Sequence, residues 1–232
     1  MSRKSYQHSS SMPILNSQNY KLTMKKLSDF DVKVTIIGNS SAGKTSLVTR
    51  ITSDTFLDDN YSTIGAAYCS FNHELNNKNI VFKMWDTAGQ ERFKSLVPMY
   101  LKNSNIILIV FDITNNNSFK SVNKWYKIAD KIAPDSIKIL IGSKLDLEKS
   151  RQILTYDANY FATNHDMKYI ECSSKECTNI DKVTDSIIST GTQIYKNTLF
   201  EEDDNDNDII RIDNEGWGEK IQSNCAYECY NN

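Results

Sequence analysis

Residues 38–45 read GNSSAGKT and match the pattern G-x-x-x-x-G-K-[ST]. An apolar run at 32–37 precedes them and a helical pattern at 44–51 follows, which is the strand–loop–helix context that this pattern requires. Glycines let such a loop curl so that its backbone N–H groups and the helix N-terminus point at phosphate oxygens. Lys44 would place a positive charge on the terminal phosphates, and the Thr45 hydroxyl would coordinate Mg²⁺. The pattern predicts nucleotide binding without indicating which nucleotide.

A second group of polar residues follows the apolar run at 80–85. Asp86 would lie at a strand end beside the phosphate-binding loop, where an Asp can hold Mg²⁺. Gly89 allows a close approach of its backbone N–H to the terminal phosphate, and the Gln90 side chain can orient a water for in-line attack, so Gln90 is the catalytic candidate. Thr63 could complete the Mg²⁺ shell only when that phosphate is present. The alternative is an ordinary turn, because Asp and Gly also favour turns.

Two further motifs follow apolar runs that end near residues 141 and 171. The first is SKLD at 143–146. Its carboxylate, Asp146, can accept two hydrogen bonds from guanine N1–H and N2–H₂, a donor pair that adenine lacks, and Lys144 can lay its stem along the base. The second is ECSSK at 171–175, whose backbone N–H groups could meet guanine O6. Either motif alone could be a plain loop or a helix start, but both are placed at the carboxyl ends of strands, where α/β sheets bind ligands.

Strand-like and helical patterns alternate along the chain. Strands are expected at 32–37, 66–75, 80–85, 106–111, 137–141 and 168–171, and helices at 44–51, 118–132, 156–164 and 180–195. Alternation implies crossover connections and a mostly parallel sheet, whereas the Asn-rich stretch at 76–79 indicates one hairpin. We expect a three-layer α/β domain over residues 31–196, with a mostly parallel six-stranded sheet, one antiparallel edge strand and about five helices.

Composition limits the other possibilities. The 232 residues carry a net charge of −2, which provides no general attraction for nucleic acid, and no apolar run is long enough to span a membrane. Residues 1–30 are polar and mildly basic, and we interpret them as a flexible arm. Residues 197–232 include the acidic run EEDDNDND at 201–208 and are expected to be a disordered tail. The five cysteines lack the spacing of a zinc site, and their odd number without a secretory signal indicates a reducing compartment.

Taken in order, these motifs resemble those of the Ras superfamily of small GTPases over residues 31–196. The words WDTAGQE at 85–91, ERFKSL at 91–96 and FDITNNNSF at 111–119 are similar to the Rab family, and STIGAAY with SLVPMY resembles its early-endosomal branch. The resemblance implies a P-loop GTPase domain that binds GTP and GDP with Mg²⁺, hydrolyses GTP and regulates vesicle traffic. It also implies a cytoplasmic location, on the cytosolic face of endosomal or other vesicle membranes.

The resemblance also implies roles for individual residues. Phe56 would lie over the guanine ring, Thr63 would sense the γ-phosphate, and Tyr68, Trp85 and Tyr100 would form an aromatic triad for effectors. Effectors, an exchange factor and a GTPase-activating protein would bind through segments 56–68 and 86–100. The expected nucleotide contacts are Ser40, Ser41, Ala42, Gly43, Lys44, Thr45, Ser46, Phe56, Thr63, Gly89, Ser143, Lys144, Asp146, Ser173, Ser174 and Lys175, the Mg²⁺ ligands are Thr45, Thr63 and Asp86, and Gln90 is the catalytic residue.

Two features depart from the family pattern. Ser143 stands where the family has an Asn that bonds the base and ties its loop to the phosphate-binding loop, and Ser is too short to do both, so weaker nucleotide binding is expected. Cys229 lies three residues before the C-terminal residue, and Cys225 lies four residues before Cys229. These positions are compatible either with prenylation and membrane attachment or with two inert cysteines. The competing functions are a non-hydrolysing nucleotide-bound interaction module and a P-loop ATPase or kinase, and Asp146 with DTAGQ disfavours the latter.

Overall fold

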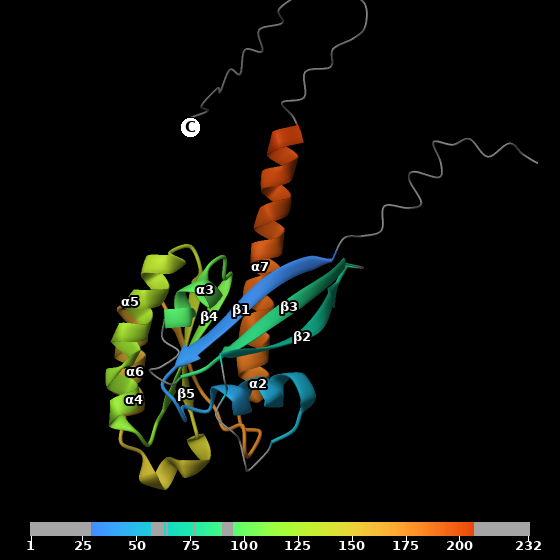
Figure 1. The fold of residues 1–232 in the computed structure, drawn as a ribbon. Helices are drawn as coiled ribbons and strands as arrows, with labels where there is room; N and C mark the ends of the chain where they lie inside the picture. Colours follow the sequence, from blue (N-terminus) through green and yellow to red (C-terminus); the bar gives the residue numbers. More distant parts are fainter. Residues whose placement is uncertain (1–28, 57–62, 64, 77, 90–94, 207–232) are drawn as a thin grey trace, which may run out of the picture. The chain divides into compact units, whose positions relative to one another are not determined.

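A computed structural model describes residues 29–56, 63, 65–76, 78–89 and 95–206. Within these ranges lies one six-stranded sheet with the strand order β2-β3-β1-β4-β5-β6 (Figure 1). Its strands are β1 (Phe30–Gly38), β2 (Ala66–Leu75), β3 (Lys78–Thr87), β4 (Ile106–Asp112), β5 (Ile137–Ser143) and β6 (Lys168–Glu171). Only the pairing of β2 with β3 is antiparallel, so the expected sheet, with its single antiparallel edge strand, is confirmed.

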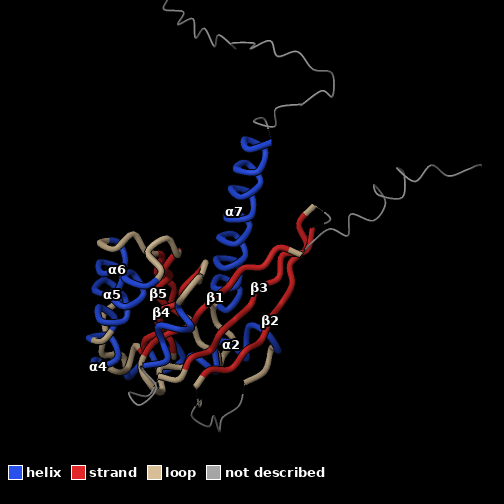
Figure 2. Tube along the Cα trace, turned by 45° about the horizontal axis from the view of Figure 1, so that its top comes forward, coloured by secondary structure: helices blue, strands red, loops and turns tan. Residues whose placement is uncertain are grey.

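Helices connect the parallel strands and cover both faces of the sheet (Figure 2). They are α2 (Lys44–Ser53), α3 (Val97–Leu101), α4 (Asn116–Lys120), α5 (Val122–Ile132), α6 (Thr155–Thr163) and α7 (Ile180–Asp206), and a 3₁₀ helix, η2, covers Leu145–Ser150. Side chains of α2 and α7 form one hydrophobic core with the sheet, and side chains of α3, α5 and α6 form the other. The architecture is therefore the expected three-layer α/β arrangement.

Strand β4 lies near the middle of the sheet, and its residues 106–111 are all apolar. All seven of its residues are buried, and successive side chains point to opposite faces of the sheet. Leu108 and Val110 belong to the core beneath α2 and α7, whereas Ile109 and Phe111 belong to the core beneath α5 and α6. A strand covered on both faces has no solvent side, so it shows no alternation of polar and apolar residues.

Several helices differ from expectation. The helix predicted at 118–132 is two helices, α4 and α5, which are separated at Ser121. The Asn115 side chain caps α4 by accepting hydrogen bonds from the backbone N–H groups of Asn117 and Ser118. Neither α3 nor η2 was predicted, because five or six residues are too few to show a period of 3.6. Helix α7 continues past residue 195 into the acidic run and ends at Asp206, since adding a residue to an established helix costs far less than starting one.

The topology brings the predicted motifs to one edge of the sheet. Because β1, β3, β4, β5 and β6 are parallel, their carboxyl ends lie along the same edge. At this edge lie the phosphate-binding loop, which follows β1, and Asp86, near the end of β3. The motif SKLD begins at the last residue of β5, and ECSSK begins at the last residue of β6. This edge is where ligands bind in open α/β sheets.

Candidate nucleotide-binding site

The phosphate-binding loop joins β1 directly to α2. Gly43 occupies the N-cap position of α2 with φ of 83°, a left-handed conformation that favours glycine. No side chain caps this helix, and no acidic residue lies in its first turn. An anion could therefore accept from backbone N–H groups at the helix start, and the helix dipole favours an anion there.

Lys44 lies within this loop, and its side chain is almost fully buried. Its ammonium donates hydrogen bonds to the backbone carbonyls of Gly38, at 3.1 Å, and Asn39, at 2.8 Å. Burial lowers the pKa of Lys44 to about 8, and the nearby Asp86 carboxylate opposes that shift. Because a buried cation is favoured by opposite charge, nucleotide phosphates beside Lys44 would raise its pKa again and further favour its charged form.

Three oxygen-bearing side chains meet next to Lys44. The Thr45 hydroxyl donates to Asp86 Oδ2 at 2.6 Å, and the Thr63 hydroxyl lies 2.9 Å from Thr45 Oγ1 and 3.3 Å from Asp86 Oδ2. Asp86 is 2% exposed, and its Oδ1 has no hydrogen-bond partner among the described residues. Burial raises the pKa of Asp86, whereas the hydrogen bond from Thr45 and the charge of Lys44 lower it.

This cluster fits a hard divalent cation. A buried carboxylate oxygen without a partner is costly, and Mg²⁺ prefers carboxylate, hydroxyl and phosphate oxygens. The described residues contain no group of three or more His, Cys, Asp or Glu that could hold a metal, so a cation here would depend on one carboxylate, the two threonines and the nucleotide itself. That dependence suits a metal bound together with phosphates.

Gly89 brings the segment after β3 against the phosphate-binding loop. A Cβ atom added to Gly89 would clash with the Lys44 ammonium, the backbone nitrogen of Ser40 and the backbone of Asn39. Only glycine allows so close an approach, as expected for a residue whose backbone N–H faces the terminal phosphate. The catalytic candidate, Gln90, lies outside the described residues.

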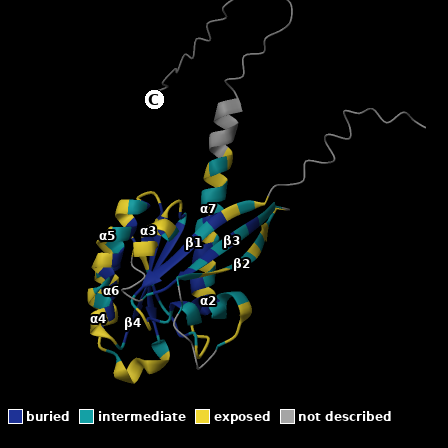
Figure 3. Cartoon of the chain, in the orientation of Figure 1, coloured by how far each residue is buried: buried dark blue, intermediate teal, exposed yellow. Residues whose placement is uncertain are grey.

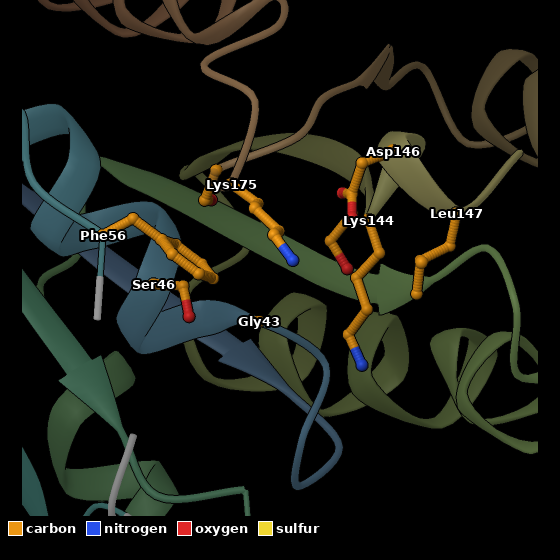
Figure 4. A pocket seen from close by; sticks show the side chains of 9 residues that line it. Gly43, Ser46, Phe56, Lys144, Asp146, Leu147 and Lys175 are labelled. Atoms are coloured by element: carbon orange, nitrogen blue, oxygen red, sulfur yellow. The ribbon is translucent and has the colours of Figure 1, made fainter. Parts of the chain in front are cut away.

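A cavity of about 230 Å³ opens beyond the loop, between Phe56 on one side and Lys144 and Asp146 on the other (Figure 4). The Ser173 hydroxyl, fully buried, donates to Asp146 Oδ1 at 2.6 Å and orients that carboxylate. The Lys144 ammonium pairs with Asp112 Oδ2 at 2.7 Å. The cavity is lined by Gly43, Ser46, Phe56, Ser143, Lys144, Asp146, Leu147, Ser174 and Lys175.

Ser143 connects the base side of the site to the phosphate side. Its hydroxyl lies 2.7 Å from the carbonyl oxygen of Ala42, in the phosphate-binding loop, and 2.9 Å from that of Phe111, and the residue is 4% exposed. One hydroxyl proton can serve only one strong hydrogen bond at a time. Ser143 thus keeps the tie between the two loops, while its hydroxyl proton is directed at backbone carbonyls and is not available to donate to a base.

The expected site residues that the structure describes come together around this loop and cavity. Ser40, Ser41, Ala42 and Gly43 form the loop, Thr45 and Thr63 meet Asp86, and Phe56, Ser174 and Lys175 line the cavity with the SKLD motif. The predicted aromatic residues are also adjacent: the ring centroids of Tyr68 and Trp85 are 5.3 Å apart, and those of Trp85 and Tyr100 are 5.8 Å apart. Tyr68 is 52% exposed, which leaves its ring available to a partner.

Sequence reasoning missed one contact that holds the phosphate-binding loop from behind. The Asn39 side chain accepts a hydrogen bond from Trp125 Nε1 at 2.8 Å and donates to Ser121 Oγ at 3.0 Å. The sequence places Trp125 only within the helix expected at 118–132. An indole N–H that is buried generally needs a partner, but nothing in the sequence pairs residues 86 positions apart.

A second feature that the sequence did not reveal is an ion-pair network between the loop that carries Asp146 and the loop that carries Ser173. Arg151, just after η2, donates to both carboxylate oxygens of Glu171 at 2.8 and 2.7 Å, and Thr155 and Tyr169 donate to the same carboxylate. Burial raises the pKa of Glu171, but the hydrogen bonds from Arg151, Tyr169 and Thr155 outweigh it and hold that pKa below its usual value. The network thereby joins the loop that carries Asp146 to the loop that carries Ser173.

Domains with this strand order and a phosphate-binding loop after the first strand form the class of P-loop nucleotide-binding proteins. Comparison with known proteins narrows the class. The model of the Ras family matches residues 33–193. The chain is 36% identical over 163 residues to the Ras-related protein Rab5 of Nicotiana tabacum, covering 70% of this chain and 82% of that protein. It is 39% identical over 157 residues to human Rab-12, covering 67% and 64%, and 36% identical over 156 residues to human Rab-30, covering 67% and 77%.

The chain belongs to the Rab family of the Ras superfamily of small GTPases. It is a GTP hydrolase and a molecular switch of vesicle trafficking, as the proteins of this family are, and the family binds guanine nucleotide with Mg²⁺ and interacts with effectors, exchange factors and GTPase-activating proteins. No helix in the part of the chain that the structure describes is long and apolar enough to cross a bilayer.

Proposed function

We propose that this chain binds guanine through Asp146, holds Mg²⁺ through Thr45, Thr63 and Asp86, and hydrolyses GTP with Gln90 orienting the attacking water. The observation that supports this most strongly is the unpartnered, buried Oδ1 of Asp86 beside two threonine hydroxyls and Lys44. When bound, Mg²⁺ would neutralise charge on the phosphate oxygens. Lys44 would bind the terminal phosphates, and Thr63 would leave the cluster when the γ-phosphate is lost.

Asp146 supports selectivity for guanine. Ser173 occupies one lone-pair direction of its Oδ1 and so fixes the orientation of the carboxylate toward the cavity. A carboxylate can still accept from two donors on a base edge, and guanine N1–H and N2–H₂ are such donors. A protonated or amide group at this position would not match that edge.

Nucleotide bound to the purified full-length protein provides the test. Lys44→Ala is expected to abolish tight GDP binding. Asp86→Ala is expected to make GDP binding independent of Mg²⁺. Lys149→Ala, which removes an exposed lysine from η2, is the matched control and should retain wild-type occupancy. Equal occupancy in Lys44→Ala and wild type, or a tightly bound adenine nucleotide in wild type, would contradict the assignment.

We further propose that segments 56–68 and 86–100, with the Tyr68–Trp85–Tyr100 cluster, bind the effectors and regulators of this switch. The exposure of Tyr68 and its edge contact with Trp85 support this surface, because exposed aromatic groups are typical interface anchors. Tyr68→Ala should weaken effector capture by the GTP-bound form and leave GDP affinity unchanged. Loss of nucleotide binding in that variant would argue against a role limited to partners.

A role on the cytosolic face of endosomal or other vesicle membranes is proposed from the resemblance of STIGAAY and SLVPMY to the early-endosomal branch and from the C-terminal cysteines. Cys225 and Cys229 lie outside the described residues. Prenylation of Cys229, with or without Cys225, would supply the membrane anchor. Expression of tagged wild type and Cys229→Ser tests it: the variant should move from the membrane fraction to the supernatant, and an unchanged distribution would exclude Cys229 as the anchor.

A further inference from the structure

One outer face of α4 and α5 carries a row of four lysines, Lys120, Lys124, Lys127 and Lys131, which we call the lysine stripe. All four side chains are exposed, and exposed and buried residues alternate along α5 (Figure 3). They line a shallow groove of about 440 Å³ together with Asn123 and Ile128. None of these residues belongs to the nucleotide site or to the Tyr68–Trp85–Tyr100 cluster.

The spacing of the stripe places its charges in a line. The steps are four, three and four residues, which return to the same side of an α-helix. Ser121, between α4 and α5, keeps right-handed helical dihedrals with φ of −78° and ψ of −14°, so the row passes from one helix to the next. At about 1.5 Å per residue, the four ammonium groups span roughly 16 Å of helix.

No acidic side chain forms an ion pair with this row within the described residues. Asp130 is the only acid of α5, and it pairs with Lys138 at 3.1 Å. None of the ion pairs or hydrogen bonds in the described ranges involves a side chain of the stripe. Like charges three and four residues apart destabilise a helix, so the free domain maintains this row at a cost. An anionic partner would remove that cost.

We propose that the lysine stripe binds an acidic helical segment of a partner protein. Glu or Asp residues three and four positions apart on such a helix are about 5–6 Å apart, which matches the spacing of the lysines. Ile128 and Asn123 add an apolar and an amide contact beside the row, and the lysine stems can cover apolar groups of the partner. The groove thus offers a polypeptide more than charge alone.

An anionic bilayer fits the same chemistry less well. Of the 27 Lys and Arg residues of the chain, the four in the stripe leave 23 to set against 29 Asp and Glu, so the remainder of the chain is net acidic. A bilayer surface is much wider than the stripe, so it would also meet the net negative charge of the rest of the chain. A short peptide lying along the stripe would feel mainly charges within about one Debye length, roughly 8 Å at physiological salt.

The test uses the full-length GDP-bound protein and a fluorescein-labelled peptide designed as a helix with Glu at four positions spaced four, three and four residues apart. Fluorescence anisotropy is measured at about 50 mM and about 300 mM NaCl, because exposed ion pairs weaken with salt. The stripe variant changes Lys120, Lys124, Lys127 and Lys131 to Gln. The matched control changes four other exposed lysines, Lys102, Lys168, Lys182 and Lys196, to Gln and so removes equal charge.

Wild type and the control should bind the peptide with similar affinity, and the stripe variant should bind at least about tenfold more weakly, as expected for the loss of four exposed ion pairs. The single variant Lys127→Glu should also weaken binding, and it keeps the test valid if the fourfold variant fails to retain GDP. Equal weakening in the stripe and control variants would overturn the proposal, as would no binding by wild type. Cosedimentation with vesicles of about 30% phosphatidylserine without peptide binding would likewise overturn it in favour of a membrane surface.

Discussion

Ser143→Asn should slow the release of GDP. In the structure the Ser143 hydroxyl is committed to the backbone carbonyls of Ala42 and Phe111, at 2.7 and 2.9 Å, and it lines the base cavity without a group that reaches a base. An Asn side chain at this position would extend into the cavity of about 230 Å³, where one N–H of its amide could donate to the base while the other keeps the hydrogen bond to the Ala42 carbonyl.

The expected magnitude follows from one hydrogen bond. A typical net contribution is about 0.5–1.5 kcal/mol, which corresponds to an affinity change of about 2- to 13-fold. Changes within one site act mainly on dissociation, so the GDP residence time should lengthen by about tenfold at the upper end, with little effect on association. Ser143→Ala should act in the opposite direction, because it leaves the Ala42 carbonyl of the phosphate-binding loop without its hydroxyl partner.

Dissociation of a fluorescent GDP analogue, measured with Mg²⁺ present, compares wild type with both variants. Ser104→Ala is the matched control, since Ser104 is another buried serine with a hydroxyl partner, Thr35 at 2.7 Å, but lies away from the nucleotide site. It should lower the free energy of unfolding without changing GDP release. If wild type and Ser143→Asn release GDP at rates within about twofold, a missing hydrogen bond to the base does not limit the lifetime of bound nucleotide.

Three further variants test other parts of the site. Gln90→Leu removes the water-orienting amide, so single-turnover GTP hydrolysis should fall at least about tenfold at unchanged GTP affinity, and a wild-type rate would exclude Gln90 as the catalytic group. Asp146→Asn replaces an acceptor by a donor, so XTP should compete better than GTP against a labelled guanine nucleotide, whereas a retained preference for GTP would refute the role of Asp146. Glu171→Gln breaks the bidentate pair with Arg151 and should lower the free energy of unfolding at pH 7 by about 1.5–3 kcal/mol. Because the pKa of Glu171 is held below its ordinary value of 4.5, the difference from wild type should shrink as the pH falls below that value, and a difference independent of pH would contradict the ion pair.

The sequence was sufficient to predict the sheet and to single out the groups that are expected to contact nucleotide. Parallel strands buried on both faces are continuous apolar runs, as in β4, and the polar motifs that follow them must meet at one edge because parallel strands end together. The phosphate-binding pattern, Asp86 and Asp146 follow from local chemistry of this kind. Short helices such as α3 could not be recognised, because five residues do not reveal a helical period.

Only the tertiary structure decided how these groups are held. The hydrogen bond from Trp125 to Asn39 and the pair between Arg151 and Glu171 join residues far apart in sequence, and no local pattern encodes which distant partner a buried polar group finds. The sequence identified Ser143 as a departure from the family pattern, but its contact with the Ala42 carbonyl depends on the close packing of β5 against the phosphate-binding loop. Residue types and spacing therefore determined the chemistry of the site, whereas the packing of strands and loops determined which hydrogen bonds hold it in place.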